Sequence, residues 1–89
     1  MRVLAMVAVF GILSSGAAAQ DKCAATEALF NMGIEARQDG DSKRKVRRML
    51  TREMGRDAAE QLADFVFALP DDQLTPAIGQ AARAQCEAL

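Results

Sequence analysis

The stretch DGDSKRKVRRMLTREMGRDAAEQLADFVFALP, residues 39–70, decides the fold class because its apolar residues recur with the period of a helix. Gly40 suits the end of a preceding helix, and Asp41 or Ser42 suits the N-cap of the next one. A helix is predicted over about residues 43–54, and Gly55 is expected to end it. Its expected core residues are Val46, Met49, Leu50 and Met54.

The second half of this stretch predicts another helix, which ends at Pro70. Asp57-Ala58-Ala59-Glu60 has the form of a capping box with Asp in the role of Ser or Thr, and we expect it to open this helix. Phe67 lies off the main apolar stripe and is the large apolar residue expected to be exposed. The residues expected to face inward are Ala58, Leu62, Phe65, Val66 and Leu69.

The flanking segments predict one more helix on each side. A first helix is expected over about residues 22–38, and Thr75 with Pro76 suits the start of a last one. The first helix has Ala25, Leu29, Met32 and Ala36 on one apolar face, Cys23, Phe30 and Ile34 on a flanking face, and Glu27, Asn31, Glu35 and Gln38 on the exposed stripe. The last helix has Ile78, Ala82, Cys86 and Leu89 on one face. Because no segment alternates like a strand, the sequence predicts an all-α bundle of about four short helices.

Residues 1–19 have the pattern of an export signal. Met1 and Arg2 provide a positive start, residues 3–13 are apolar, and a tract of small residues ends in Ala17-Ala18-Ala19. The apolar run is shorter than the roughly 20 residues that span a bilayer, and the polar residues before Cys23 do not suit a lipid anchor. We therefore expect a soluble periplasmic or secreted protein without stable membrane insertion, with residues 20–89 as a single small helical domain.

The two cysteines, Cys23 and Cys86, are predicted to form a disulfide. An exported location permits the bond, and a domain of this size is only marginally stable without some cross-link. Both residues lie on the apolar sides of their helices, so the bond would clamp the first helix to the last. A reactive or metal-binding pair is disfavoured, because the chain has no C-x-x-C spacing and no His.

A cluster of six positive charges within ten residues is the strongest candidate for a binding surface. It suggests an anionic partner, either an envelope component such as a lipid head group or glycan, or an acidic protein. Three of the six oppose the helix macrodipole from the first turn. The alternative is an ordinary solvated face moderated by nearby carboxylates. The candidate residues are Lys43, Arg44, Lys45, Arg47, Arg48 and Arg52.

Several other functions are disfavoured by the residue inventory. Nucleic acid is an improbable partner, because residues 20–89 hold ten basic against twelve acidic residues and no aromatic platform lies beside the cluster. Without His, and with Ser42 as the one serine after residue 19, we expect no enzyme. Neither a metal nor a cofactor is expected: Asp39-Gly40-Asp41-Ser42 lacks the ligand spacing of a calcium loop, and Asp71-Asp72 suits a turn.

The leading functional hypothesis is therefore a non-catalytic binding role through the basic helix face. The alternative is a periplasmic stress holdase that exposes a Met and Phe face when the bundle loosens. That face would be made of Met32, Met49 and Met54 with the phenylalanines Phe30, Phe65 and Phe67.

The segment from Met32 to Gly40, which follows Cys23 on the same helix, resembles short segments of small secreted proteobacterial proteins that have two cysteines and no assigned activity. The resemblance implies a periplasmic setting and a two-cysteine helical form. The layout also looks like that of acid-stress periplasmic chaperones of the HdeA type, at the level of the fold alone.

Overall fold

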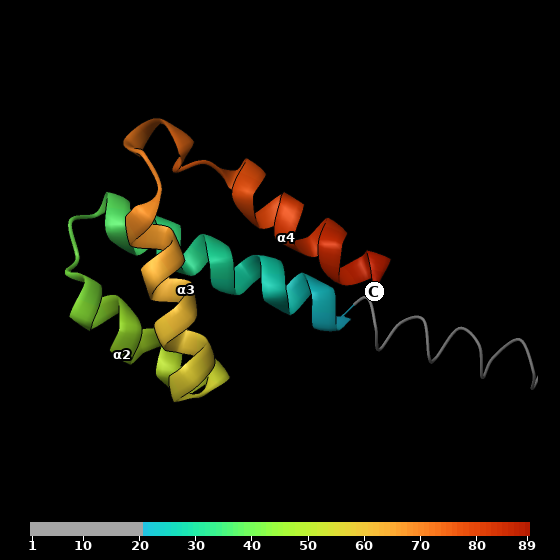
Figure 1. Cartoon of the computed structure of the whole chain (residues 1–89), viewed down its shortest axis with the longest axis horizontal. Coiled ribbons are helices and arrows are strands. Elements are labelled where there is room, and N and C mark those ends of the chain that lie inside the picture. The colour runs from blue at the N-terminus through green and yellow to red at the C-terminus, as the bar shows by residue number, and fades with distance from the viewer. Residues whose placement is uncertain (1–20) are drawn as a thin grey trace, which may run out of the picture.

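The computed structural model describes residues 21–89, and this range contains four α-helices and a short 3-10 turn but no strand (Figure 1). The first helix covers residues 21–38. It is followed by α2 (Lys43–Met54), α3 (Arg56–Ala68), the 3-10 turn η1 (Asp71–Gln73) and α4 (Pro76–Ala88). The predicted all-α class and the helix count are confirmed. The predicted signal segment, residues 1–19, lies outside the described residues.

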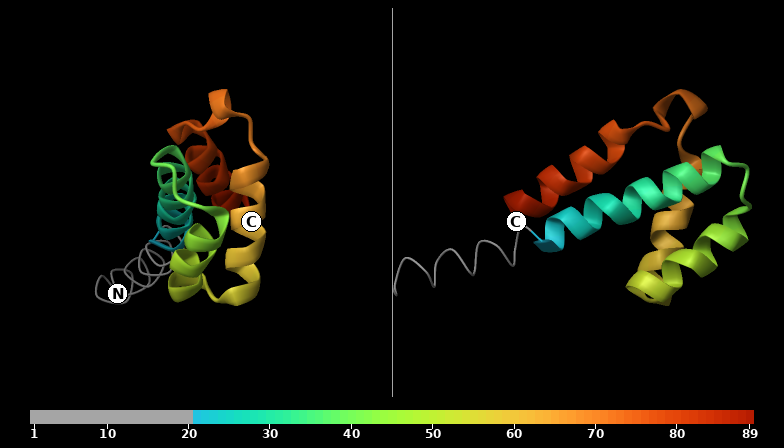
Figure 2. Two further views of the ribbon diagram at one scale, coloured as in Figure 1. Left: turned by 90° about the vertical axis from the view of Figure 1, so that its left-hand side faces the viewer. Right: turned by 180° about the vertical axis from the view of Figure 1, so that it is seen from behind.

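The first helix is the axis on which the other helices pack. In Figures 1 and 2, α2 and α3 form a hairpin against its C-terminal half, and α4 runs back along its N-terminal half. The C-terminus of the chain therefore lies beside the N-terminal end of the first helix. None of the helices within residues 21–89 is long and apolar enough to cross a membrane.

The hydrophobic core lies between the α2–α3 hairpin and the C-terminal half of the first helix. Leu50, Val46 and Val66 are the largest side chains with no exposed surface. Leu74, which follows η1, closes one side of the cluster, whereas Gly79 is the one fully buried residue of α4. The buried cluster consists of Ile34, Ala36, Val46, Leu50, Ala59, Leu62, Val66 and Leu74.

The predicted helix ends around α2 are confirmed. Ser42 is its N-cap, and the Ser42 Oγ accepts a hydrogen bond of 3.1 Å from the Lys45 backbone N–H. Gly40 and Gly55 have φ angles of 89° and 87°, in the left-handed region that glycine adopts without strain. The Gly55 N–H donates to the Thr51 carbonyl at 3.0 Å, so this glycine ends α2.

The predicted capping box at Asp57 is wrong. The N-cap of α3 is Gly55 and the helix begins at Arg56, so a single residue joins α2 to α3. The Gly55 carbonyl already accepts from the Ala59 N–H at 3.0 Å, which leaves Asp57 inside the first turn rather than before it. At α4 the predicted positions of Thr75 and Pro76 are confirmed, although the Thr75 side chain makes no capping hydrogen bond within the described range.

The buried face of α3 is rotated from the predicted one. Ala59 and Ala63 are fully buried, whereas Ala58 is exposed. Phe65 was expected inward but has 43% of its surface exposed, and Phe67 was expected outside but is half-buried. The reason is that α3 is covered by α2 as well as by the first helix, so its buried stripe is centred between two neighbours.

Smaller deviations occur at the edges of the bundle. Met49 and Met54 of the predicted core are half-buried against it. Ala25 and Leu89 are exposed, because Ala25 lies in the part of the first helix beyond the core and Leu89 follows the end of α4.

The predicted disulfide between Cys23 and Cys86 is confirmed, with an Sγ–Sγ distance of 2.02 Å. It joins the first helix to the last turns of α4. Next to it, Arg83 Nη1 donates to Glu27 Oε1 at 3.2 Å, and this hydrogen bond raises the pKa of Arg83. Glu27 was expected on the exposed stripe of the first helix, but that part of the stripe is covered by α4.

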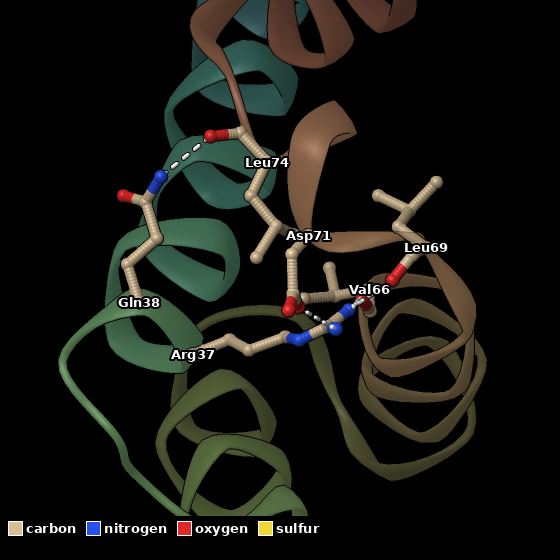
Figure 3. A network of polar contacts seen from close by, with 6 residues as sticks. All are labelled: Arg37, Gln38, Val66, Leu69, Asp71 and Leu74. Carbon is tan, nitrogen blue, oxygen red and sulfur yellow. Dashed lines mark hydrogen bonds and ion pairs between the residues drawn. The ribbon is translucent and has the colours of Figure 1, made fainter.

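A set of polar contacts ties the first helix to the end of α3 and to η1 (Figure 3). The Arg37 guanidinium donates to the carbonyls of Val66 and Leu69 and pairs with Asp71. Gln38 Nε2 donates to the Leu74 carbonyl. These two side chains donate to carbonyls at the end of a helix and in the following loop, where intrahelical partners are missing; the Val66 carbonyl also accepts from the Leu69 backbone N–H at 3.4 Å.

Candidate functional site

The outer face of α2 carries a row of arginines because its inner face is used by the core. Val46 and Leu50 point inward with no exposed surface. Arg44, Arg48 and Arg52 follow one another at intervals of four residues, so they form a ridge on the opposite side of the helix. All three are exposed.

The two lysines of the predicted cluster have carboxylate partners within the protein. Lys43 Nζ lies 2.6 Å from Asp64 Oδ1 of α3, and Lys45 Nζ lies 3.3 Å from Asp41 Oδ1. Two of the three cations in the first turn of α2 are therefore compensated locally. The Lys43–Asp64 pair is exposed and the Lys45–Asp41 pair is partly exposed, so each contributes at most about 1 kcal/mol to stability.

The four arginines of the predicted cluster differ from the lysines in this respect. Arg44, Arg47, Arg48 and Arg52 form no ion pair with any residue in the range 21–89. The structure thus separates the six predicted residues into two paired lysines and four arginines whose guanidinium groups face solvent.

A fifth arginine, Arg56, joins this surface and was missed by the sequence analysis. The one-residue link at Gly55 places Arg56 beside α2, and together with Arg47 and Arg48 it lines a hollow of about 250 Å³. Thr51 and Glu60 complete the lining. Gly55, which separates the two helical stretches, could have indicated that α3 begins at Arg56. The predicted capping box instead placed the start of α3 after Arg56.

A second hollow of about 360 Å³ adjoins the first along α2. Its lining residues are Lys45, Arg48, Met49 and Arg52. Arg48 lines both hollows, so the two form a continuous basic surface. Met49 is its one apolar member, and its side chain is half-buried.

Charge is strongly segregated in the described part of the chain. The helix α2 holds six basic residues and one acidic residue, whereas the remainder of residues 21–89 holds four basic and eleven acidic residues. The small formal net charge is therefore the sum of a strongly basic helix and an acidic remainder. Such a distribution makes the electrostatic potential over the outer face of α2 positive.

The apolar residues proposed for a holdase face do not form one surface. Phe30 and Phe65 meet edge to face with ring centroids 5.8 Å apart. They line a groove of about 270 Å³ between the first helix, α3 and α4, together with Ile78, Ala81, Ala82 and Gln85. Met32 and Met49 line a different groove, which also contains Glu35, Asp39 and Asp41.

The third phenylalanine, Phe67, lies under the Arg37 guanidinium, whose carbon is 5.6 Å from the ring centroid. It is therefore part of the contact between the first helix and α3 rather than of either groove.

Among residues 21–89, no group of three or more His, Cys, Asp or Glu side chains is arranged to hold a metal ion. Asp41, considered above for a calcium loop, instead pairs with Lys45, and the neighbouring Ser42 caps α2.

Comparisons of the chain with protein-family models, with curated proteins and with solved structures find no match.

Proposed function

We propose that this chain is a small exported helical protein that binds an anionic partner, without catalysis, through the outer face of α2. One observation carries the proposal: the lysines of the basic cluster are paired within the protein, whereas Arg44, Arg47, Arg48 and Arg52 form no ion pair with residues 21–89. A row of like charges on one helix face destabilises that helix by a few tenths of a kcal/mol per neighbouring pair. A bound anion would relieve this repulsion.

The proposed contact is electrostatic and does not involve insertion into a bilayer. Val46 and Leu50 of α2 are enclosed in the core, and Met49 and Met54 are half-buried against it, so α2 offers no fully exposed apolar side chain to a membrane. Arginine is suited to such a contact, because its planar guanidinium binds carboxylate and phosphate groups through two parallel hydrogen bonds. The partner is accordingly an anionic envelope component or an acidic protein.

The export part of the proposal is supported by the pattern of residues 1–19 and by the disulfide. Disulfides persist in oxidising compartments such as the periplasm and are rare in the cytosol. The Cys23–Cys86 bond is compatible with the periplasmic or secreted location predicted from the sequence.

The binding test uses two double variants of the same helix. The protein would be sedimented with vesicles that contain an anionic lipid and, separately, captured on an acidic glycan. The Arg44→Gln/Arg52→Gln variant removes two unpaired charges from the outer ridge, and we expect it to lose at least about 1 kcal/mol of binding, or fivefold in affinity. The matched Lys43→Gln/Lys45→Gln variant removes the same formal charge from ion-paired positions and should lose less.

Ionic strength provides the second reading of this experiment. Because the proposed contact is exposed, its affinity should fall steeply as the Debye length shortens from about 10 Å at 0.1 M salt to about 3 Å at 1 M. Binding that resists salt, or that is equally weakened in the two double variants, would contradict a contact made by the unpaired arginines.

The second candidate is a stress holdase, which is favoured by the exposed Phe65 and its groove. The groove is largely apolar and is covered on one side by α4, a helix that contributes no large buried side chain. If α4 moved away, Phe30 of the first helix and Phe65 of α3 would be uncovered as an apolar surface for unfolded clients, and Ile78 would be exposed on α4 itself. A holdase would suppress the aggregation of a denatured client in a salt-insensitive manner, and Phe65→Ser should reduce that effect without changing vesicle binding.

A further inference from the structure

We propose that the hollow at the corner between α2 and α3 is a binding site for a phosphomonoester group. Its three guanidinium groups come from Arg47, Arg48 and Arg56, and we call this set the arginine cradle. The inference rests on the proposed function and narrows it, because it assigns one part of the basic surface to one ligand chemistry.

The backbone brings the three arginines together. Gly55 is the entire link between α2 and α3, and its φ of 87° turns the chain back at the point where a residue with a side chain would be strained. Arg56 is the first residue of α3 and therefore lies at the mouth of the corner, next to the last two turns of α2. A cradle built from two rigid helices holds its donors in place better than one built from a single loop.

The hydrogen-bonding capacity of the cradle is concentrated in the guanidinium groups. Thr51 also lines the hollow, but its hydroxyl donates to the Arg47 carbonyl at 2.7 Å and so is not free to donate to a ligand. Each guanidinium carries five N–H donors. A carboxylate, with two oxygens, engages one guanidinium through a bidentate contact, whereas a phosphomonoester presents three terminal oxygens.

The net charge of the residues that line the hollow also favours a phosphomonoester. Three arginines and one carboxylate, Glu60 of α3, leave two net positive charges around the space. Within residues 21–89, no ion pair of 4.0 Å or less joins Glu60 to an arginine of the cradle. A phosphomonoester carries a charge of about −1.5 to −2 at pH 7, since its second pKa is near 6. The ligand and the cradle are therefore complementary in charge.

The test compares methyl phosphate with methyl sulfate, which have the same shape but differ by one charge at neutral pH. Binding is followed by NMR chemical-shift changes of the arginine side chains in the intact disulfide-bonded protein. At pH 7.5 we expect methyl phosphate to bind at least about fivefold more tightly, a difference of about 1 kcal/mol. At pH 5 the phosphate is mostly a monoanion, and this preference should disappear. Methyl sulfate reports any change in binding that arises from the protein itself between the two pH values.

Three variants locate the site. Arg47→Gln/Arg56→Gln should abolish the preference for phosphate, whereas Arg44→Gln/Arg52→Gln removes the same number of charges outside the cradle and should retain it. Arg48→Lys keeps the charge but loses the bidentate fork, and we expect it to lower the preference. All five positions are exposed, so each variant should remain helical, and circular dichroism is the check of this.

Vesicles distinguish the two sources of the group. If the ligand is a lipid, vesicles with phosphatidic acid, a phosphomonoester, should be preferred over vesicles with phosphatidylglycerol, a phosphodiester of lower charge. If it is a small soluble ester, methyl phosphate shows the preference and the vesicles do not. Either result supports the cradle.

Equal binding of methyl phosphate and methyl sulfate at pH 7.5 would overturn the inference, as would a phosphate preference that survives in Arg47→Gln/Arg56→Gln. Suppose that methyl phosphate and methyl sulfate bind equally, while Arg44→Gln/Arg52→Gln still loses vesicle binding. Then anion binding through the outer face of α2 stands and the cradle fails. If the phosphate preference is found but that ridge variant binds vesicles and glycan normally, the cradle stands and the wider binding surface fails.

Discussion

At the scale of single residues, Arg37 is the side chain that most directly joins the first helix to the rest of the bundle. It is 17% exposed, and its guanidinium donates to the Leu69 carbonyl at 2.6 Å as well as to the Val66 carbonyl at the end of α3. Its partner in the ion pair, Asp71, is 95% exposed and lies 3.0 Å away. The Val66 carbonyl also accepts a long hydrogen bond of 3.4 Å from the Leu69 N–H, and Arg37 is the donor to the Leu69 carbonyl, because a helix leaves its last carbonyls without intrahelical partners.

We therefore predict that the carbonyl contacts of Arg37 matter more than its ion pair. Arg37→Met keeps much of the apolar stem but removes the donors, and it should lower the free energy of unfolding by about 1.5–3 kcal/mol. Asp71→Asn should lower it by less than about 1 kcal/mol, because exposed ion pairs contribute little. Urea denaturation measures both, and a larger loss for Asp71→Asn than for Arg37→Met would show that the order is reversed.

The residue scale also shows where the pattern of the sequence was insufficient. Arg37 has no neighbour in the chain that marks it as a helix-capping side chain, since the carbonyls it binds are about thirty residues away. The reversed burial of Phe65 and Phe67, relative to the prediction, also depends on residues that are distant in the chain. Both follow the helical period closely enough to be candidates for burial, and the neighbouring helices decide which one is covered.

At the scale of elements, the contact between α4 and the first helix is a close approach at Gly79. A Cβ atom added to Gly79 would lie 2.3 Å from Asn31 Oδ1 and 3.2 Å from the Glu27 carbonyl oxygen. The Asn31 side chain can move aside, but the backbone carbonyl cannot move without shifting the helix. The position of α4 therefore depends on the absence of a side chain at Gly79.

We predict that Gly79→Ala destabilises the protein although alanine favours helices. The gain in helix propensity is about 1 kcal/mol, and overpacking of a closely packed contact costs about 1–3 kcal/mol, so the net effect should be a loss of up to about 2 kcal/mol. Gln80→Ala, at the next and exposed position of α4, is the control and should change stability by less than about 0.5 kcal/mol. Thermal unfolding compares the two, and a Gly79→Ala protein that is more stable than the control would contradict the close approach.

At the scale of the whole molecule, the bundle has two parts that differ in how much apolar surface they bury. The α2–α3 hairpin and the C-terminal half of the first helix share the buried core. The helix α4 is held by the disulfide, the Glu27–Arg83 pair, Gly79 and the half-buried Ile78. Regions with few buried apolar contacts open first, so α4 is the part of the molecule that depends most on the disulfide.

We predict that loss of the disulfide loosens α4 before the rest of the bundle. The Cys23→Ala/Cys86→Ala variant should lose about 4 kcal/mol of stability, because the bond closes a long loop in the unfolded chain. Native-state hydrogen exchange should show a loss of protection in α4 while α2 and α3 remain protected. The reduced wild-type protein serves as a control for the substitutions. Uniform loss of protection in all helices would show that α4 is an integral part of one cooperative unit.

The sequence by itself determined the helices, their approximate ends and the disulfide. These features depend on local chemistry: apolar residues at the helical period, glycines that adopt a positive φ at Gly40 and Gly55, Ser42 as an N-cap, and two cysteines with one possible pairing. It also located the basic cluster on α2, because charge can be counted along a chain.

Only the tertiary structure decided which of these charges remain unpaired and what they surround. Asp64 pairs with Lys43 from another helix, and Arg56 reaches Arg47 and Arg48 because the chain reverses at Gly55. The exposure of Phe65, the partners of Arg37 and the close approach at Gly79 likewise depend on residues that are distant in the chain. Burial and pairing are properties of two surfaces in contact, and the period of one helix specifies only its own side of each contact.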